Sequence, residues 1–390
     1  MAENKSPQQT LSAEERMARG STWLTLGNVG SRLLGAIYVV PWFYWLGSDQ
    51  YQANALFNMG YNFYALFLMI STAGIPAAFS KQTAHYNSLN EYATSRRLFK
   101  NALVVMAIFG AICSGVMYLM APWLAKISGG GTELIPVIRS LSVAVLVIPC
   151  MSVMRGYFQG QHDMMPYAIS QLAEQVARVF YMLLATFFIM KVGSGKYEEA
   201  VVQSTFAAFL GALASIALLL YYLQKNRVRM DYLVEHSANN IKLDTRELIV
   251  ETIREAIPFI IIGTGITIFK IVDQVTFVRT MQGFTTYSAV QLQKLFSIFS
   301  ANPDKLTMVV IGLATSMALT GLPLITEAKT LNKQKELSKL ISNNLQLFAF
   351  VMFPATFGMM LLAYPLNTLF YAPSDLGSRV LIVAGITGLF

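Results

Sequence analysis

Residues 168–183, AISQLAEQVARVFYML, have the apolar composition of a helix that crosses a lipid bilayer. Glu174 and Arg178 lie inside this stretch, four residues apart, which places both side chains on one face of a helix. A charge in hydrocarbon is costly unless it is paired or reaches water. The stretch therefore predicts a membrane helix whose charged face is turned away from lipid, toward other helices.

The composition of the whole chain extends this interpretation. Of its 390 residues, 55% are hydrophobic and only 13% are charged, and long apolar runs recur along it. These features predict an all-α polytopic membrane protein. The apolar windows that are long enough to be membrane spans are residues 21–46, 55–80, 98–124, 134–157, 166–191, 199–224, 256–279, 305–326, 339–363 and 378 onward.

The net charge of +8 comes mostly from Lys and Arg between the windows, a topology signal and not a sign of nucleic-acid binding. Basic loops alternate with loops poor in Lys and Arg, and the basic side includes the N-terminus. This bias predicts that the N-terminus is cytoplasmic. The expected parts are a cytoplasmic segment at 1–20, a six-helix N-lobe at 21–224, a cytoplasmic interlobe loop at 225–250 and a partial C-lobe of about four spans at 251–390.

Two pairs of similar stretches suggest an internal repeat. STAGIPAAFSK, which ends the second window, resembles ALTGLPLITEAK, which ends the eighth, and YLMAPWLAKI resembles LLAYPLNTLF at nearly the same offset. We expect two six-helix lobes related by a parallel repeat, with the second lobe incomplete, so that the chain is a shortened version of a longer transporter. The alternative is that Gly-Pro kinks recur in membrane proteins without any repeat.

Three windows combine an apolar body with one polar stripe. Because such stripes are costly in lipid, we expect them to face a shared interior that is wet or filled by a ligand. Arg32 has no acid on its own helix, which makes it the strongest candidate for binding an anion. The alternative is that the charges within the fifth and seventh windows neutralise each other and hold helices together. The stripe residues are Asn28 and Arg32 in the first window, Gln171, Glu174 and Arg178 in the fifth, and Lys270 and Asp273 in the seventh.

Two further cations, Arg155 and Lys305, lie near the ends of predicted spans. Long basic side chains at such positions usually extend to the membrane surface, and we expect this snorkelling for both. Arg155, in MRGYFQG, and Lys305, in NPDKLTM, are nevertheless candidates for residues of the shared interior.

The chain shows no enzyme signature. Its three histidines lack a second ligand at metal spacing, and GSGK at 193–196 is too short for a phosphate-binding loop. No loop presents paired carboxylates or a nucleophile beside a base. We therefore expect no enzymatic activity, no metal site and no cofactor, and the energy source is left open between a coupling ion and the membrane potential.

The stretch MRGYFQGQHDMMPYAISQLAEQVARVF, residues 154–180, resembles the MurJ-type lipid II flippases of Gram-positive bacteria, close to the YtgP and SpoVB branch. The resemblance covers nearly the whole chain and implies the fold of the MOP exporter superfamily, with two six-helix lobes around a central cavity. The other stretches similar to this family are GSRLLGAIYVVP at 30–41, YALFLMISTAGIPAAFSK at 64–81 and IPFIIIGTGITIFKIVDQVTF at 257–277.

The resemblance implies a transporter that flips lipid II, a polyprenyl-pyrophosphate-linked cell-wall precursor, across the bacterial cytoplasmic membrane. Cavity arginines of the family are thought to hold the pyrophosphate; Arg32 aligns with one of them, and Lys305 falls where arginine is frequent. Tyr38 and Val39 stand where Gram-negative relatives carry an Arg-Asp pair, which favours the Gram-positive branch. The implied partners are a lipid-linked oligosaccharide, the phospholipid bilayer and proteins of cell-wall synthesis or division.

Three other functions stay open at this point. They are flipping of another polysaccharide repeat unit, cation-coupled drug antiport of the MATE type, and a non-transporting membrane scaffold. Antiport would need a deep acid that dominates the interior, whereas deep cations outnumber deep acids in this sequence.

Overall fold

The structure, a computed structural model, describes residues 23, 27, 30–72, 74–238, 245–308, 310–311, 325 and 333–387. Every regular element in these ranges is helical, which confirms the all-α prediction. Asn28, one of the candidate site residues, lies outside the described residues, as does most of the eighth apolar window.

Long apolar helices dominate the described chain, as the composition predicts. The six that are long and apolar enough to cross a membrane are α5 (Tyr92–Ile127), α6 (Leu134–Gly160), α7 (Met164–Phe187) with the π turn that follows it, α8 (Tyr197–Lys225), most of α10 (Thr245–Phe284) and α13 (Gln334–Leu361). A seventh would be the pair α14 (Ala363–Phe370) and α15 (Asp375–Thr387), which is bent by 118°. The chain is therefore a polytopic membrane protein.

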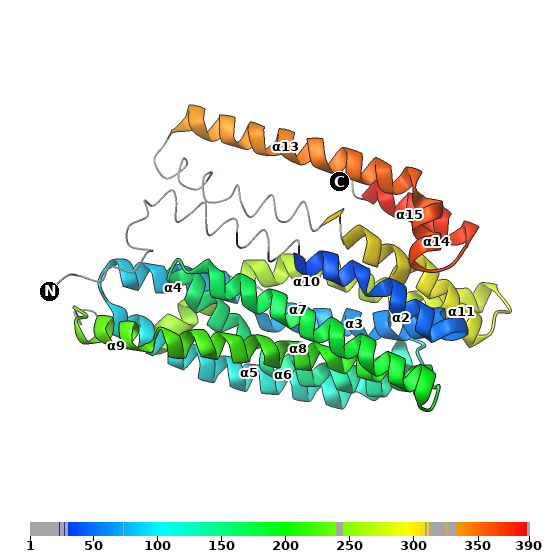
Figure 1. Ribbon diagram of the computed structural model, residues 1–390, viewed down its shortest axis with the longest axis horizontal. Helices are drawn as coiled ribbons and strands as arrows, with labels where there is room; N and C mark the ends of the chain where they lie inside the picture. Colours follow the sequence, from blue (N-terminus) through cyan, green and yellow to red (C-terminus); the bar gives the residue numbers. More distant parts are fainter. Residues whose placement is uncertain are drawn as a thin grey trace.

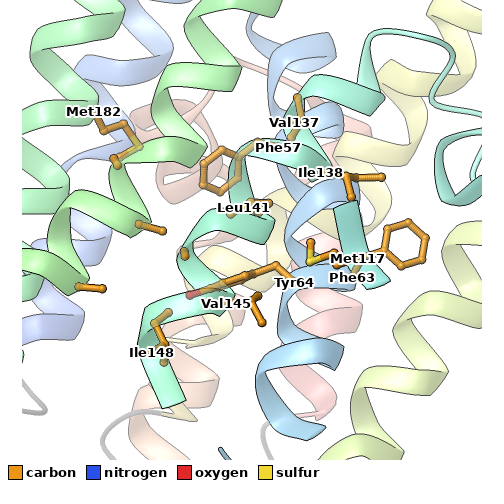
Figure 2. Packing of buried hydrophobic residues seen from close by; sticks show 14 of the residues in the cluster. Phe57, Phe63, Tyr64, Met117, Val137, Ile138, Leu141, Val145, Ile148 and Met182 are labelled. Atoms are coloured by element: carbon orange, nitrogen blue, oxygen red, sulfur yellow. The ribbon is translucent and has the colours of Figure 1, made fainter. Parts of the chain in front are cut away.

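The N-lobe is built around α6. In the most apolar part of α6, 61% of the residues are buried, against 22% for α5 and 11% for α7. Packing in such a bundle rests on close van der Waals contact, because lipid is as apolar as the side chains. Figure 2 shows side chains of α6 meeting those of α3 (Gln50–Thr72), among them Val137, Ile138, Leu141, Val145, Phe57, Phe63 and Tyr64.

The Gly-Pro motif of the second window marks a helix break inside a stretch expected to be one span. α3 ends at Thr72, and α4 (Ile75–Ser88) begins after Gly74, whose φ of 74° lies in the left-handed region that glycine adopts freely. Pro76 follows in the first turn of α4, where a missing N–H leaves no helical bond unmade.

The expected interlobe loop contains helical structure. It includes α9 (Arg227–Glu235) and the first turns of α10. Asp231 of α9 forms an ion pair of 2.5 Å with Arg96 of α5. The hydroxyl of Ser237 accepts a hydrogen bond of 3.2 Å from the backbone N–H of Ala93, and the N–H of Ala238 donates to the carbonyl of Asn90 at 3.0 Å. The first part of the connector is thus fixed to the N-lobe.

The amphipathic stretch before Asp304 lies between the lobes. It forms α11 (Ala289–Phe296), which begins with a capping box between Ser288 and Gln291, and then a π turn (Ser297–Ala301). Both pack against α3. In Figure 1, α13, α14 and α15 lie on one side of the molecule, α5, α6 and α8 on the other, with α10, α3 and α2 (Val39–Leu46) between them.

Candidate functional site

The helical stretch 30–37, which contains Arg32, and α7 approach each other closely through small residues. A Cβ added to Gly27 would lie 3.2 Å from the Cα of Ala168, and one added to Gly30 would lie 3.0 Å from a methyl of Leu172. Glycine at these positions lets the two helices pack almost backbone to backbone. The helix of Arg32 is thereby placed beside the polar stripe of α7.

Within that stripe, Glu174 binds Arg155 of α6, at 2.7 Å. Arg155 also donates to the hydroxyls of Ser170 at 3.0 Å and Ser215 at 2.9 Å, so the cluster joins α6, α7 and α8. The Arg155 side chain is only 12% exposed. The snorkelling expectation for Arg155 is therefore wrong, because a partly buried carboxylate and two hydroxyls satisfy the guanidinium inside the lobe.

Arg178 does not form an ion pair with Glu174, the acid one turn away on its own helix. Its guanidinium donates to the hydroxyl of Tyr61 on α3 and lies 5.1 Å from the centre of that ring. No carboxylate of the described residues lies within ion-pair distance of Arg178. The self-neutralising Glu174–Arg178 pair, one of the two interpretations of this stripe, is thus not what the structure shows.

Behind the stripe, α8 packs directly on the backbone of α7. A Cβ added to Gly211 would lie 2.7 Å from the carbonyl oxygen of Glu174 and 3.1 Å from the Cβ of Arg178. The charged turn of α7 therefore has α8 behind it. Gln171, the other predicted residue of this stripe, is partly buried one turn before Glu174.

Lys305 lies among aromatic rings and does not reach toward a membrane surface. Its ammonium donates to the side-chain oxygen of Asn54 at 2.5 Å. It also lies 4.6 Å from the ring centre of Trp42 and 5.1 Å from that of Phe57. Cation–π attraction and the hydrogen bond to the Asn54 amide offset the free-energy cost of removing the ammonium from water. The snorkelling expectation is wrong for Lys305 as well. We call the four surrounding rings the aromatic box: Tyr38, Trp42, Phe43 and Phe57.

Arg32 and Lys305 come together where the lobes meet. The guanidinium of Arg32 donates to the backbone carbonyl of Met308 at 3.1 Å, one turn beyond Lys305. On the other side of Lys305, Phe57 stacks on Tyr61 with ring centres 5.0 Å apart, and Tyr61 binds Arg178. Of the three cations predicted from separate windows, Lys305 and Arg178 thus contact α3, and Arg32 binds the helical turn that follows Lys305.

The charges of the seventh window do not neutralise each other, which was the alternative interpretation of this window. Lys270 binds Asp304 at 2.7 Å, across the C-lobe, and Asp273 is exposed and forms no ion pair among the described residues. Lys270 and Asp273 are three residues apart and share a helix face, but the ammonium of Lys270 pairs with Asp304 and not with Asp273. Asp273 is therefore not part of the interlobe cluster.

Sequence reasoning missed a row of asparagines on α3. Asn54, Asn58 and Asn62 recur every four residues and so share one face of the helix. Asn54 donates to the side chains of Asn302 at 2.7 Å and Ser297 at 3.0 Å. The other two reach Ser300 at 3.3 Å and Gln274 at 2.8 Å. Amides spaced by four in an apolar window are a visible signal, and it marks the face of α3 that meets the C-lobe.

The charges of this region have a simple balance. Glu174 and Asp304 are neutralised by Arg155 and Lys270, whereas Arg32, Arg178 and Lys305 are held by a carbonyl, a phenol and an amide. Among the described residues, then, the interlobe region has three cations without an acid partner. An anionic ligand can displace a neutral partner from a cation at a lower free-energy cost than it can displace a carboxylate.

Comparison with known proteins identifies the family of this chain. The family model described as polysaccharide biosynthesis protein matches residues 17–329. The lipid II flippase MurJ of Bacillus subtilis (strain 168) is 36% identical over 379 residues, which cover 94% of this chain and 69% of the relative. Stage V sporulation protein B of the same organism is 23% identical over 57% of this chain and 42% of its own length. The resemblance to MurJ-type and SpoVB-like proteins is confirmed.

Solved structures agree on the fold. An inward-facing multidrug resistance MATE family transporter of the MOP superfamily superposes with a TM-score of 0.64 at 16% identity, over 91% of this chain and 76% of its own. A Vibrio cholerae MATE transporter gives 0.63 at 13% identity, over 96% of this chain and 81% of its own. These likenesses show a MATE-like helical architecture. Because the family model matches most of the chain and the flippase relative is 36% identical, the chain belongs to the polysaccharide biosynthesis protein family.

Proposed function

We propose that this chain is a flippase that moves lipid II across the bacterial cytoplasmic membrane and catalyses no covalent step. The observation that carries the proposal is the group of three cations, Arg32, Arg178 and Lys305, which among the described residues are held by neutral groups. The 36% identity to a lipid II flippase supports the choice of substrate.

The chemistry of the three cations suits a pyrophosphate. A guanidinium presents a planar fork that binds two phosphate oxygens at once, and an ammonium adds a flexible point charge. Arg32 and Arg178 would bind the pyrophosphate by exchanging a carbonyl and a phenol for phosphate oxygens. The pairs Arg155–Glu174 and Lys270–Asp304 would keep their surroundings neutral, so that the three cations alone attract the anion.

The arrangement of the lobes suggests how the substrate would cross. The polar head group would lie between the lobes near α3, while the polyprenyl tail stays in lipid. Rocking of one lobe against the other would expose the site to one side of the membrane and then to the other. The Lys/Arg bias of the loops supports an orientation with the N-terminus in the cytoplasm.

Two alternatives differ in how well the charges support them. Another lipid-linked polysaccharide unit carries the same pyrophosphate and would use the same cations, so a substrate panel must separate the two. Cation-coupled drug antiport has less support, because Glu174 and Asp304 already bind Arg155 and Lys270, and Asp273 is exposed and lies outside the interlobe cluster. The likeness to MATE transporters, at 16% identity, concerns the fold alone.

The test is direct binding of lipid II and of polyprenyl pyrophosphate to the chain in lipid nanodiscs. We expect Arg32→Ala and Arg178→Ala each to weaken binding about tenfold or more, because each removes a charge-assisted bond. Arg279→Ala is the matched control, since Arg279 of α10 is exposed. Equal binding by the wild type and both cavity variants would remove the proposal, and binding of cationic drugs without lipid binding would favour antiport.

A further inference from the structure

The aromatic box sets a constraint on Lys305 that goes beyond its charge. Ring faces carry partial negative charge, so they attract an ammonium and repel a phosphate. With Trp42 at 4.6 Å and Phe57 at 5.1 Å, Lys305 is surrounded by groups that would not admit a pyrophosphate. An anion can therefore reach Lys305 only after the ammonium has left the box. The four-carbon side chain of lysine is flexible enough for that movement.

The group that holds Lys305 in the box also holds the lobes together. Asn54 of α3 accepts from Lys305 at 2.5 Å through its oxygen, and donates through its nitrogen to Asn302 at 2.7 Å and Ser297 at 3.0 Å. Asn54 and Ser297 are 0% exposed, and Asn302 is 3% exposed. One buried amide thus joins α3 to three side chains of the C-lobe.

Further contacts continue this seam along α3. Asn58 donates to Ser300 in the π turn at 3.3 Å, and Asn62 donates to Gln274 at 2.8 Å. π turns are often found at functional positions, and here the turn presents Ser297 and Ser300 to successive asparagines. We call the contacts of Asn54, Asn58 and Asn62 with the C-lobe the asparagine seam.

We propose that Asn54 and the anionic substrate compete for Lys305, so that binding of a pyrophosphate opens the asparagine seam. The inference rests on the proposed function and adds a positioning role for Asn54, which does not itself contact the substrate. With the ammonium in the box, Asn54 is fully bonded and the lobes are joined at the seam. With the ammonium on the anion, Asn54 loses its strongest partner and the seam is weakened. Because coupling of this kind is reciprocal, a stronger seam must weaken anion binding, and a weaker seam must strengthen it.

Opposite substitutions at one position test the competition. The probes are polyprenyl pyrophosphate and inorganic pyrophosphate, and the sample is the full chain in nanodiscs. Asn54→Ala removes the competitor and should tighten binding about fivefold or more, within the usual range of coupling between sites. Asn54→Asp places a carboxylate beside the ammonium and should weaken binding by a similar factor. Weaker binding by both variants would mean that Asn54 supports or touches the site, and would overturn the competition.

A second measurement follows the seam itself. In a chain without its native cysteines, Asn58→Cys with Ser300→Cys should form a disulfide without ligand, and pyrophosphate should slow its formation. Adding Lys305→Gln should make the rate insensitive to pyrophosphate. An unchanged dependence on pyrophosphate in that variant would overturn the role of Lys305. This disulfide measurement does not use Asn54→Ala, so it tests the proposal even if that variant fails to fold.

The two levels of the proposal fail in different ways. If the wild type and every variant fail to bind either probe, the proposed function falls and the competition falls with it. If the wild type binds pyrophosphate through Arg32 and Arg178 but Asn54→Ala binds more weakly, only the competition is overturned.

Discussion

Glu174 binds Arg155, which lies 19 residues earlier on α6, at 2.7 Å, although Arg178 is one turn away on its own helix. An exposed pair at i and i+4 stabilises a helix by only about 0.2–0.5 kcal/mol. A partly buried carboxylate gains more from a guanidinium that two hydroxyls of neighbouring helices also fix. The pairing leaves Arg178 available for other ligands.

Arg155→Leu should therefore destabilise the N-lobe by about 1–3 kcal/mol, because Glu174 is left without its cation in a partly buried place. The measurement is thermal unfolding in detergent. The matched control is the double variant Arg155→Leu with Glu174→Leu, which removes both charges and should recover part of the loss. If the double variant is less stable than Arg155→Leu alone, the unpaired charge of Glu174 is not the cause of the destabilisation.

Gly211→Ala should weaken the packing of α8 on α7. Its new methyl would lie 2.7 Å from the carbonyl oxygen of Glu174, and a backbone atom cannot move aside as a flexible side chain can. We expect a loss of about 1–3 kcal/mol, in the range of overpacked cores. Gly115→Ala in α5 is the control, because an added Cβ there meets nothing within 4 Å. Equal unfolding temperatures for the two variants would contradict the close approach at Gly211.

Arg32→Lys should recover only part of the binding that Arg32→Ala loses. Lysine keeps the charge but lacks the planar fork for two phosphate oxygens. The measurement is affinity for polyprenyl pyrophosphate in nanodiscs, with growth of a flippase-depleted strain as a second readout. Full recovery by lysine would show that Arg32 acts through charge alone, and the bidentate contact would have to be given up.

The predicted orientation can be checked with single cysteines in a chain without Cys113 and Cys150. Val228 of α9 is 83% exposed, and Ser48 lies in an exposed turn between α2 and α3. With a cytoplasmic N-terminus, Val228→Cys should resist an impermeant thiol reagent in intact cells, while Ser48→Cys should react. The reverse pattern would invert the proposed orientation.

Local pattern was enough to predict the membrane class and the long apolar helices of this chain, because hydrophobic composition and helix periodicity are properties of short stretches. The polar stripe of α7 was predictable for the same reason. The partners were not, since Lys305 meets Asn54 from 251 residues away and Lys270 meets Asp304 from 34 residues away. The aromatic box requires rings from two other helices, and no spacing along the chain encodes their approach. The asparagines of α3 are visible in the sequence at a spacing of four residues, but that spacing does not identify the side chains that they meet.

The attachment of α9 to the N-lobe limits how far the lobes can part. Through Ser237 and Ala238 the chain is fixed to the corner between α4 and α5, and α10 begins at Thr245. The seven peptide links between Ala238 and Thr245 can extend to roughly 25 Å at most, from the reach of a fully stretched chain. The connector is therefore short compared with the molecule that it joins. This length limits the separation of the lobes only near α9, so we expect the widest opening at the opposite end of the molecule.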